Sequence, residues 1–453
     1  MTAVNKKSVM IAVLLLVLLT SGTSLQKART EKAGERGASA VGRKIRSLNG
    51  GLPLRAKGPR YAPGELLIRF RPSVSTQFVD ATLARYGTNK IKKISQLNLY
   101  QVRIPDWTSV EEMAYALSQN PDVISAGPNY AAHIMVTPED PLFRYQYALS
   151  NSGQDVGPPG SPSGKAKADI KATAGWEETK GTAETVIAII DSGIDFNHPD
   201  LKNKVISPGY DFANDDADAT DDNGHGTYVA GIAAADTNNN EGIAGVAWNC
   251  RILPVKVTDA EGGAWYDDII DGILWAADNG AHVINLSMGG EETDDSMRDA
   301  LKYAHDKGVV IAASAGNDDT AVFYPAAYDD YCLAVAATDY EDSRAYYSCF
   351  GPEVDVAAPG DWVLSTWPTY MVDLNEYLPY IWANGTSASA PHVAGLAALI
   401  KGLKPSLTAD QVMDVIRFSS DDVNSEEFSG KDDYIGYGRI NMEKALVPIK
   451  LAK

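Results

Sequence analysis

VIAIIDSGID, residues 186–195, is the stretch that decides the fold. Five apolar residues run directly into an Asp and a turn that contains Gly, a pattern typical of a buried strand in a parallel sheet. Further apolar runs of strand length alternate with stretches of helical periodicity. The runs lie at residues 252–257, 283–286, 309–313 and 333–337, and the helical stretches at 267–277 and 295–305. The alternation predicts an α/β fold in three layers, α/β/α, with a mostly parallel sheet whose functional groups gather at the carboxyl ends of the strands.

A smaller unit precedes this main body at residues 61–138. Its apolar pattern predicts strands at 65–70, 97–103 and 123–127, and helices at 75–86 and 109–119. This order of elements predicts a small ferredoxin-like α+β sandwich. Residues 139–175 are rich in Pro, Gly and Ser, which predicts a poorly structured lead-in to the main domain at 176–453.

The amino terminus has the order of a secretory signal. An apolar stretch, residues 9–19, follows Lys6 and Lys7 and precedes small polar residues at 20–24. Because this stretch is short for a membrane span, we predict a signal peptide at 1–26 and secretion to the extracellular space. An uncleaved membrane anchor is the alternative.

Residues 27–60 are basic and lack periodicity, which predicts a flexible linker. No later segment is apolar for 18 residues, so we expect no membrane contact once the signal is removed.

Charge is divided unevenly along the chain, whose net charge is −19. Residues 1–136 carry 19 Lys and Arg against 8 Asp and Glu, whereas residues 137–453 carry 21 against 51. The two regimes indicate a basic front piece and an acidic main body, held together partly by electrostatic attraction. Since an acidic body of this charge repels phosphate, nucleic acid is excluded as its partner.

The three cysteines, Cys250, Cys332 and Cys349, allow at most one disulfide within the chain. Cys332 opens a predicted strand and Cys349 lies in a later segment, so a bridge forms only if the two segments are neighbours. Bridged and free states both remain open. Cys250 leads into a predicted buried strand, which favours an unreactive core thiol.

Three polar residues, in the order Asp191, His225 and Ser387, carry the chemistry. Asp191 ends the first strand, His225 stands in NGHGTYVAGIAAA where a helix starts, and Ser387 stands in NGTSASAPHVAGL where another helix opens. A helix start disfavours a charged imidazole and stabilises a nearby oxyanion. Each residue alone is weak evidence, but the three together, in Gly-flanked turns at one sheet edge, match a known order of the Ser–His–Asp triad.

These residues lie in motifs that resemble those of the subtilisin-like serine proteases. The motifs are DSGID at 191–195, HPDL at 198–201, HGTYVAGI at 225–232, NLSMGG at 285–290, AGN at 315–317, APG at 358–360 and GTSASAPHVAG at 385–395. The resemblance covers nearly the whole chain from Tyr61 onward. It implies a subtilisin-like fold and a serine endopeptidase that hydrolyses peptide bonds through an acyl-enzyme. Tyr228 stands where the family usually has His, and we expect it to alter packing more than chemistry.

The resemblance also assigns the catalytic roles. Asp191 orients and stabilises the imidazole, His225 is general base and acid, and Ser387 is the nucleophile. Asn317 donates its side-chain amide to the oxyanion together with the Ser387 N–H. A catalytically inactive relative used for binding or adhesion is the main alternative, but all four residues are present. A convertase-like processing protease is a further alternative, which the glycines of NLSMGG disfavour.

Residues 61–138 resemble the inhibitory propeptide of the same family, through PGELLIRF at 63–70 and NPDVISAGPNY at 120–130. The resemblance implies that this unit guides folding and inhibits the enzyme within the same molecule. It also implies self-cleavage between about residues 133 and 139. We expect a monomeric enzyme that acts on proteins and peptides.

For substrate binding, the resemblance implies two edge strands and a first pocket between them. The substrate backbone adds a strand to these edges, and the pockets provide specificity. The assigned residues are Gly262, Gly263 and Ala264 on one edge, Ser287, Met288, Gly289 and Gly290 on the other, and Ala313, Ser314, Ala315 and Gly316 beside them. Their small size predicts a roomy, mostly apolar pocket and broad specificity. The aromatic-rich loop 367–382 either shapes the leaving-group side or packs on itself.

Calcium is implied at one or two structural sites. The first set comprises Asp140, Asp200 and Asn239 with the main chain of Asp236, Glu241 and Ile243. The second comprises Asp211, Asn214, Asp216, Asp218 and Thr220, in the acidic loop YDFANDDADATDDNG at 210–224. Both offer the oxygen ligands that Ca²⁺ prefers, and the carboxylates of the loop repel one another without a cation. A solvated acidic loop is the alternative for the second set.

Overall fold

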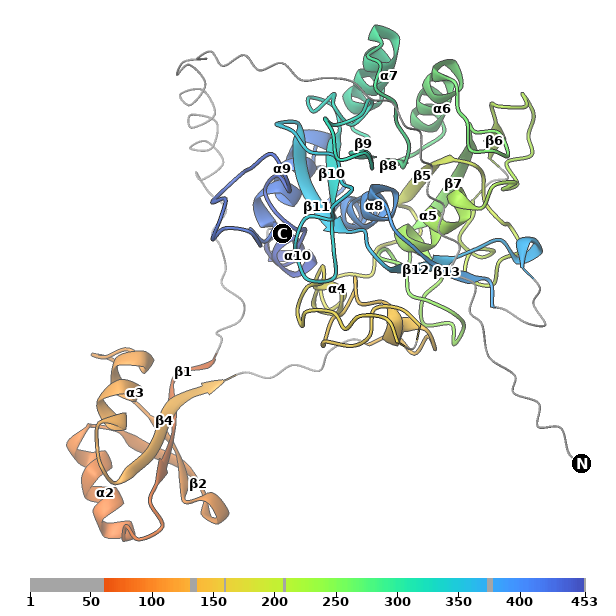
Figure 1. Cartoon of the computed structure of the whole chain (residues 1–453). Coiled ribbons are helices and arrows are strands. Elements are labelled where there is room, and N and C mark those ends of the chain that lie inside the picture. Colours follow the sequence, from red (N-terminus) through yellow and green to blue (C-terminus); the bar gives the residue numbers. More distant parts are fainter. Residues whose placement is uncertain (1–60, 131–136, 159, 207–208, 373–377, 452–453) are drawn as a thin grey trace, which may run out of the picture. The chain divides into compact units, whose positions relative to one another are not determined.

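A computed structural model of the chain describes residues 61–130, 137–158, 160–206, 209–372 and 378–451 (Figure 1). The predicted signal peptide at 1–26 and linker at 27–60 lie outside these residues, as does most of the predicted cleavage region. The described residues form two bodies, residues 61–130 and residues 137–451.

The first body is an antiparallel sheet with two helices. Its elements are β1 (Tyr61–Phe70), α2 (Thr76–Arg85), β2 (Asn89–Ile94), η1 (Ser95–Leu97), β3 (Leu99–Arg103), α3 (Val110–Ser118) and β4 (Val123–Tyr130). The strand order β2-β3-β1-β4 and the order βαββαβ along the chain are those of a ferredoxin-like sandwich, as predicted. A capping box of Ser109 and Glu112 starts α3, and Leu66, Ile68 and Phe70 of β1 fill the core.

Strand β2 was not predicted. Its sequence NKIKKI leaves five of six residues exposed, so it lacks the buried alternation by which a strand is recognised. It is the edge strand of the sheet, and lysines are typical of such edges.

The second body is built on a parallel sheet. The described strands follow the order β11-β10-β9-β8-β5-β7-β6, and all adjacent pairs among them are parallel. Their bounds are β5 (Val186–Asp191), β6 (Tyr210–Asp211), β7 (Arg251–Lys256), β8 (Val283–Leu286), β9 (Val310–Ser314), β10 (Leu333–Thr338) and β11 (Val354–Pro359). Strand β5 has β7 as its neighbour on one side and β8 on the other. The strand order therefore changes direction beside β5, and functional sites of such sheets form at this place.

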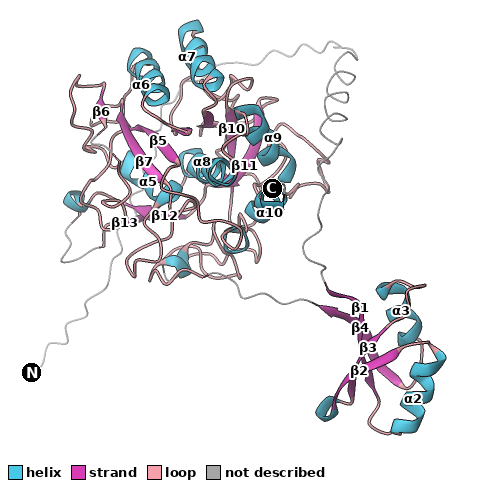
Figure 2. Ribbon diagram, turned by 180° about the vertical axis from the view of Figure 1, so that it is seen from behind, coloured by secondary structure: helices cyan, strands magenta, loops and turns pink. Residues whose placement is uncertain are grey.

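Helices cover both faces of this sheet (Figure 2). On one face lie α5 (His225–Ala234), α8 (Thr386–Leu403), α9 (Ala409–Ser419) and α10 (Met442–Leu451). On the other lie α6 (Tyr266–Asp278) and α7 (Asp295–Asp306). The three-layer α/β/α prediction is confirmed.

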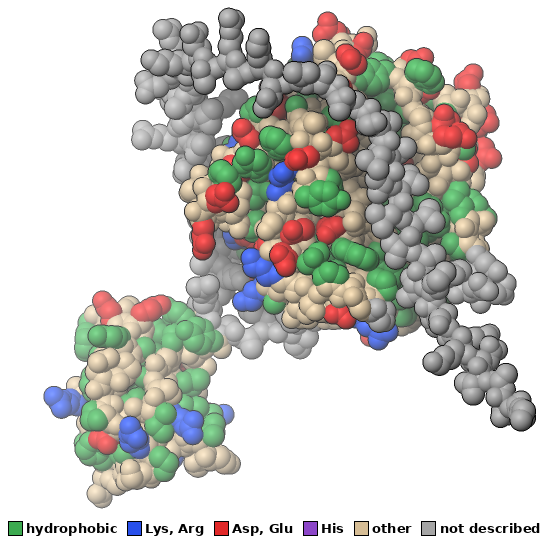
Figure 3. Space-filling model, viewed as in Figure 1, with side chains coloured by type: hydrophobic (Ala, Val, Ile, Leu, Met, Phe, Trp, Pro, Cys, Tyr) green, Lys and Arg blue, Asp and Glu red, His purple; other side chains and the backbone are tan. Residues whose placement is uncertain are grey.

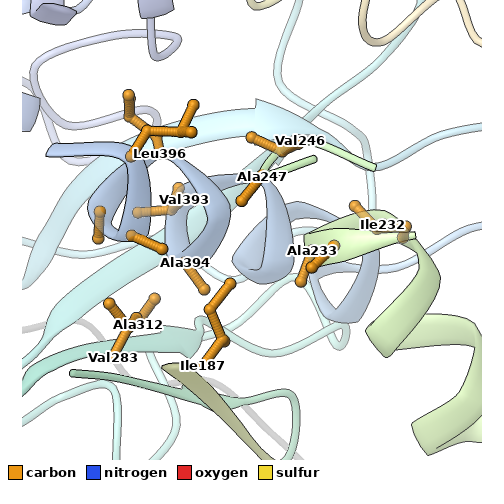
Figure 4. Packing of buried hydrophobic residues seen from close by; sticks show 14 of the residues in the cluster. Ile187, Ile232, Ala233, Val246, Ala247, Val283, Ala312, Val393, Ala394 and Leu396 are labelled. Atoms are coloured by element: carbon orange, nitrogen blue, oxygen red, sulfur yellow. The ribbon is translucent and has the colours of Figure 1, made fainter. Parts of the chain in front are cut away.

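Side chains of β5 alternate between the two cores. Ile187 and Ile189 pack in the core under α8, whereas Ala188 and Ile190 pack in the core under α6 and α7. Figure 4 shows Ile187 below Ala394 of α8, with Ile232 and Ala233 of α5 beside them. Burial of β5 on both faces explains its unbroken apolar run.

The lead-in, residues 139–175, has few regular elements but is firmly packed. It contains η2 (Phe143–Tyr145) and the single turn α4 (Ala172–Gly175). Tyr147 and Ile170 have no exposed surface, and Phe143 and Leu149 belong to the core under α8. The prediction of poor structure is right about helices and strands and wrong about packing, because irregular backbone here carries buried apolar side chains.

The structure adds one element that was not predicted and decides one point that the sequence left open. An antiparallel hairpin of β12 (Val363–Thr366) and β13 (Tyr380–Ala383), with η3 (Thr369–Met371), was not predicted as regular structure. The three cysteines are free and buried, which decides against a Cys332–Cys349 disulfide. Among the described helices, none is long and apolar enough to cross a membrane.

Candidate active site

Asp191 is the last residue of β5 and is almost fully buried. Its Oδ1 accepts a hydrogen bond from the Ser192 backbone N–H at 2.8 Å and lies 2.8 Å from His225 Nδ1. The contact fixes His225 with Nδ1 as the donor and leaves Nε2 as the basic nitrogen. Asp191 and His225 therefore form the orienting half of a triad.

His225 is the first residue of α5, and the backbone before it requires glycine. Gly224 has φ +104°, and a Cβ at this position would lie 2.5 Å from the Trp367 ring. The Trp367 ring thus lies against the turn that carries the imidazole. The His225 side chain keeps 37% of its surface exposed, so Nε2 remains accessible to substrate.

The pKa of His225 is raised above 6.5, contrary to the expectation from its place at a helix start. Burial lowers this pKa, but the charge of Asp191, its hydrogen bond and the charge of Asp221 together outweigh burial. The prediction that the helix dipole keeps the imidazole neutral is therefore wrong in sign. A raised pKa still leaves a neutral base available above that pKa.

Asp221 organises the same turn and was missed as a site residue. Its Oδ1 accepts hydrogen bonds from the Ser192 hydroxyl and from the N–H groups of Asn223 and Gly224, and its Oδ2 accepts one from the Thr227 N–H. It is 1% exposed. An Asp near the start of a helix is a sequence signal for a helix cap. Asp221 was overlooked because it is one of many acidic residues in its loop.

Ser387 is the second residue of α8, after Gly385, whose φ is +149°. Its hydroxyl donates to the Ser287 carbonyl oxygen at 3.2 Å, and the Ser287 hydroxyl donates to the Ser387 carbonyl oxygen at 3.0 Å. Ser387 is thereby held directly beside the end of β8. Catalytic hydrogen bonds often tighten only when substrate binds, so the bond to Ser287 is compatible with a nucleophile.

Asn317 lies on the other side of the nucleophile. Its Oδ1 accepts hydrogen bonds from the Thr386 N–H at 2.8 Å and from the Thr386 hydroxyl at 2.9 Å. With Oδ1 engaged, the amide NH₂ is the group left to donate, and a Cβ at Gly385 would lie 3.4 Å from it. The side chain is exposed, which suits a donor to a substrate oxyanion.

The predicted substrate segments follow β7 on one side of β5, and β8 and β9 on its other side. Gly262, Gly263 and Ala264 lie in a turn after β7, where Asp259 accepts hydrogen bonds from the Glu261 and Gly263 N–H groups. Residues 287–290 follow β8, and residues 313–316 run from the end of β9. The three segments meet at the carboxyl edge that also carries the triad residues.

The first predicted calcium set comes together around Asp200. Asp200 Oδ1 accepts a bond from Asn239 Nδ2, and Oδ2 accepts bonds from the Ile243 N–H and the Tyr380 hydroxyl. Asp140 of the lead-in accepts the N–H groups of Asn238 and Asn239. Asp236 donates its N–H to the Asp200 carbonyl oxygen, and Glu241 donates its N–H to Asn239 Oδ1.

Burial favours the uncharged form of the two carboxyl groups in this set. It raises the pKa of both Asp140 and Asp200, and the charge of Asp200 raises the pKa of Asp140 further. Two buried carboxylates that disfavour each other's ionised form are what a bound cation would stabilise.

The residues of the second set form hydrogen bonds mainly with one another. Asp211 accepts two bonds from Asn214, Asp216 accepts the Asp218 N–H, and Asp218 accepts bonds from Thr220. The buried ammonium of Lys256 lies 3.7 Å from Asp211 and 2.9 Å from Asp222. Among the described residues, no group of three or more His, Cys, Asp or Glu is arranged to hold a metal, so both sets depend on amide, hydroxyl and main-chain oxygens.

The described residues of the aromatic-rich loop 367–382 contact neighbouring segments of the chain and do not pack only on one another. Thr369 donates its N–H and hydroxyl to Asp195, and the Tyr370 hydroxyl donates to the Asp221 carbonyl oxygen. His198 Nε2 lies 3.0 Å from the Pro379 carbonyl oxygen. The loop therefore contacts the segments after β5 and before α5 that position Asp191 and His225.

A buried Asp that contacts an accessible His at the switch of a parallel sheet, and a Ser that opens a helix beside the end of β8, are typical of the class of the serine peptidases. Comparison with known proteins agrees. Residues 182–438 match the Subtilase family, and residues 54–129 match the fervidolysin N-terminal prodomain. The chain therefore belongs to the subtilase family and is a serine endopeptidase with an N-terminal prodomain, and the resemblance seen in its motifs is confirmed.

Two relatives and one solved structure illustrate the likeness. The chain is 38% identical to a thermophilic serine proteinase of Bacillus sp. (strain AK1), over 85% of this chain and 88% of the relative. It is 40% identical to thermitase of Thermoactinomyces vulgaris, over 68% of this chain and 99% of the relative. The crystal structure of fervidolysin from Fervidobacterium pennivorans, a keratinolytic enzyme related to subtilisin, aligns with TM-score 0.57 and 26% identity, over 86% of this chain and 62% of that one.

Proposed function

We propose that Asp191, His225, Ser387 and Asn317 carry the reaction of this protease. The observation that supports this most directly is the 2.8 Å contact of His225 Nδ1 with the buried Asp191, beside a Ser at the amino end of α8. A serine hydroxyl is a weak nucleophile, so it requires a base whose tautomer is fixed.

The proposed steps follow from these positions. His225 Nε2 takes the proton of Ser387 as Oγ attacks the substrate carbonyl carbon, and Asp191 stabilises the imidazolium. The Asn317 amide and the Ser387 N–H donate to the oxyanion. His225 then gives its proton to the leaving amine, and water hydrolyses the acyl-enzyme by the same route in reverse. Loss of one oxyanion donor costs about 10²–10³ in kcat, a magnitude measured in a subtilisin.

The protein is proposed to be a secreted monomer that acts on many protein substrates and matures by itself. The apolar stretch at residues 9–19 supports export. The match of residues 54–129 to a protease prodomain supports inhibition by this unit until it is cut off near residues 133–139. Recognition through the substrate backbone at exposed edges supports action on many sequences.

Calcium is proposed to bind at the set around Asp200. Asp140, Asp200 and Asn239 would supply side-chain oxygens, and Asp236, Glu241 and Ile243 main-chain oxygens. The raised pKa of both carboxylates supports the fit. A bound Ca²⁺ would supply positive charge there and no catalytic step. The acidic loop, with Asp211, Asn214, Asp216, Asp218 and Thr220, is proposed as the second set.

The catalytic assignment is tested by expressing the full precursor beside its Ser387→Ala variant. We expect the wild type to shorten to a body that begins near residue 137 and to digest casein, while the variant stays long and inactive. Mass spectrometry and casein digestion measure the two effects. If the wild type also stays long and inactive although folded, the inactive binding or adhesion protein becomes the better interpretation.

A further inference from the structure

The proposed active site, on which this inference rests, has a pocket with two walls. One wall is residues 287–290, and Ser287 exchanges hydrogen bonds with the nucleophile Ser387. The other wall is residues 313–316, which Asn317 follows directly. A substrate side chain on the acyl side of the scissile bond must therefore enter between these two segments.

Residues 323 and 324 form backbone hydrogen bonds with both walls of the pocket. The Phe323 N–H donates to the Ala315 carbonyl oxygen at 2.9 Å. Tyr324 and Gly290 exchange two N–H to carbonyl bonds, each 2.8 Å long. The backbone at Phe323 is thus fixed to both walls, which fixes the place from which its side chain extends.

The Phe323 ring lies against the glycines of both walls. A Cβ at Gly316 would lie 3.0 Å from Phe323 Cγ and 3.1 Å from Cδ2, and a Cβ at Gly289 would lie 3.2 Å from Phe323 Cβ. Behind Gly316 is the buried Cys349, whose Sγ would lie 2.9 Å from that same Cβ. The wall therefore cannot retreat from the ring to widen the pocket.

We infer that Phe323 forms the floor of this pocket and restricts the residue before the scissile bond to small side chains. A large aromatic side chain that enters between the walls would need the space that the ring occupies, and overpacking of this kind is unfavourable. An Ala side chain ends before it reaches the ring. The inference replaces the expectation of a roomy pocket, which considered only the small residues of the walls and not the residue that closes them.

The test compares tetrapeptide p-nitroanilides that differ only in the residue before the scissile bond, with Ala, Leu or Phe at that place. The measured quantity is the ratio of kcat/KM for Phe to kcat/KM for Ala in the mature enzyme. We expect wild type to favour Ala by about tenfold or more, and Phe323→Ala to raise the ratio by about tenfold or more. Phe323→Leu is expected to give an intermediate ratio.

The matched control is Phe418→Ala, which removes the same side chain from an exposed position on α9 and should leave the ratio unchanged. Because the ratio is measured within one preparation, partial misfolding of a variant does not alter it. Equal cleavage of the Phe and Ala substrates by wild type, or an unchanged ratio in Phe323→Ala, overturns the inference. Failure of the proposed function is distinct, since wild type would then cleave none of the substrates and behave like Ser387→Ala.

Discussion

His225 faces two carboxylates, Asp191 in direct contact and Asp221 at longer range. Burial lowers the pKa of His225, whereas both charges raise it, and the net result lies above 6.5. The imidazole must lose its proton to act as a base, so kcat/KM should rise with pH through that raised pKa. We expect the acid limb of the wild-type profile to lie above pH 6.5, measured as kcat/KM from pH 5 to 9.

Asp221→Asn should move this limb to lower pH. The change removes one of the charges that raise the pKa of His225. The single Asn oxygen can keep the bonds from Ser192, Asn223 and Gly224, while the bond from the Thr227 N–H is lost. The control is Asp222→Asn, the neighbouring carboxylate, which pairs with Lys256 and should leave the limb in place. A limb that stays fixed or moves to higher pH in Asp221→Asn would show that Asp221 does not act on the charge of His225.

Residues of the site differ in how far the sequence reveals them. Asp191, His225, Ser387 and Asn317 stand in short local patterns with glycine, because each needs a special turn of the backbone. Phe323 carries no local signal, since its role follows from contacts with Gly289 and Gly316 that only the folded chain creates.

At the scale of elements, the hairpin of β12 and β13 is joined to α5 by Tyr228. The Tyr228 hydroxyl donates to the Val363 carbonyl oxygen at 2.9 Å, and the side chain is 3% exposed. The phenol thus contacts a neighbouring element, and the expectation that Tyr228 alters packing more than chemistry stays a prediction.

Tyr228→Phe should therefore destabilise the fold by about 1–3 kcal/mol, because it leaves a buried carbonyl oxygen without that donor. Urea unfolding would measure the change in the Ser387→Ala background, which avoids self-digestion. Tyr346→Phe, at a side chain that is 81% exposed, serves as the control and should change stability little. A loss in Tyr228→Phe no larger than in the control would contradict the proposed link.

Elements with a regular apolar pattern were predictable, and irregular or polar ones were not. Strands β5, β7, β8, β9 and β10 were predicted to within one residue at each end because they are buried on both faces. Strands β2, β6 and β11 and the hairpin were missed. Strand β2 is exposed, β6 is very short, and the hairpin is defined by contacts with distant segments, whereas β11 is buried but Asp355 interrupts its apolar run.

At the scale of the whole molecule, the Asp200 set joins segments that are distant in sequence. Asp140 comes from the lead-in, Asp200 from the segment after β5, Asn239 from the loop after α5 and Tyr380 from β13. An ion at this place would tie the lead-in to the main body.

Chelation of calcium should therefore lower the midpoint of thermal unfolding of the Ser387→Ala protein, by several degrees or more. Asp200→Asn should remove most of the difference between calcium-loaded and chelated samples. Asp216→Asn tests the acidic loop in the same way. An unfolding midpoint that does not depend on calcium would contradict both proposed sites.

The positive charge of the front piece is not evenly divided between residues 1–60 and residues 61–130. Residues 61–130 carry seven Lys and Arg against six Asp and Glu, so most of the positive charge of the front piece belongs to residues 1–60. On the face shown in Figure 3, the acidic side chains of the second body are spread widely, over α6 and α7 as well as elsewhere. Half of the large exposed hydrophobic side chains of the described residues, among them Trp107 and Tyr115, lie on the prodomain. The electrostatic attraction expected from the sequence stays a prediction, and it would depend mainly on the charges of residues 1–60.

The buried free thiols bear on the conditions under which the enzyme works. Because Cys250, Cys332 and Cys349 are all unbridged and have no exposed surface, the fold requires no oxidation to form. A reductant that opens the cross-links of a tough, disulfide-rich substrate would leave the covalent structure of the enzyme itself unchanged. Reducing agent and protease can therefore be combined in one vessel without breaking a covalent link of the enzyme.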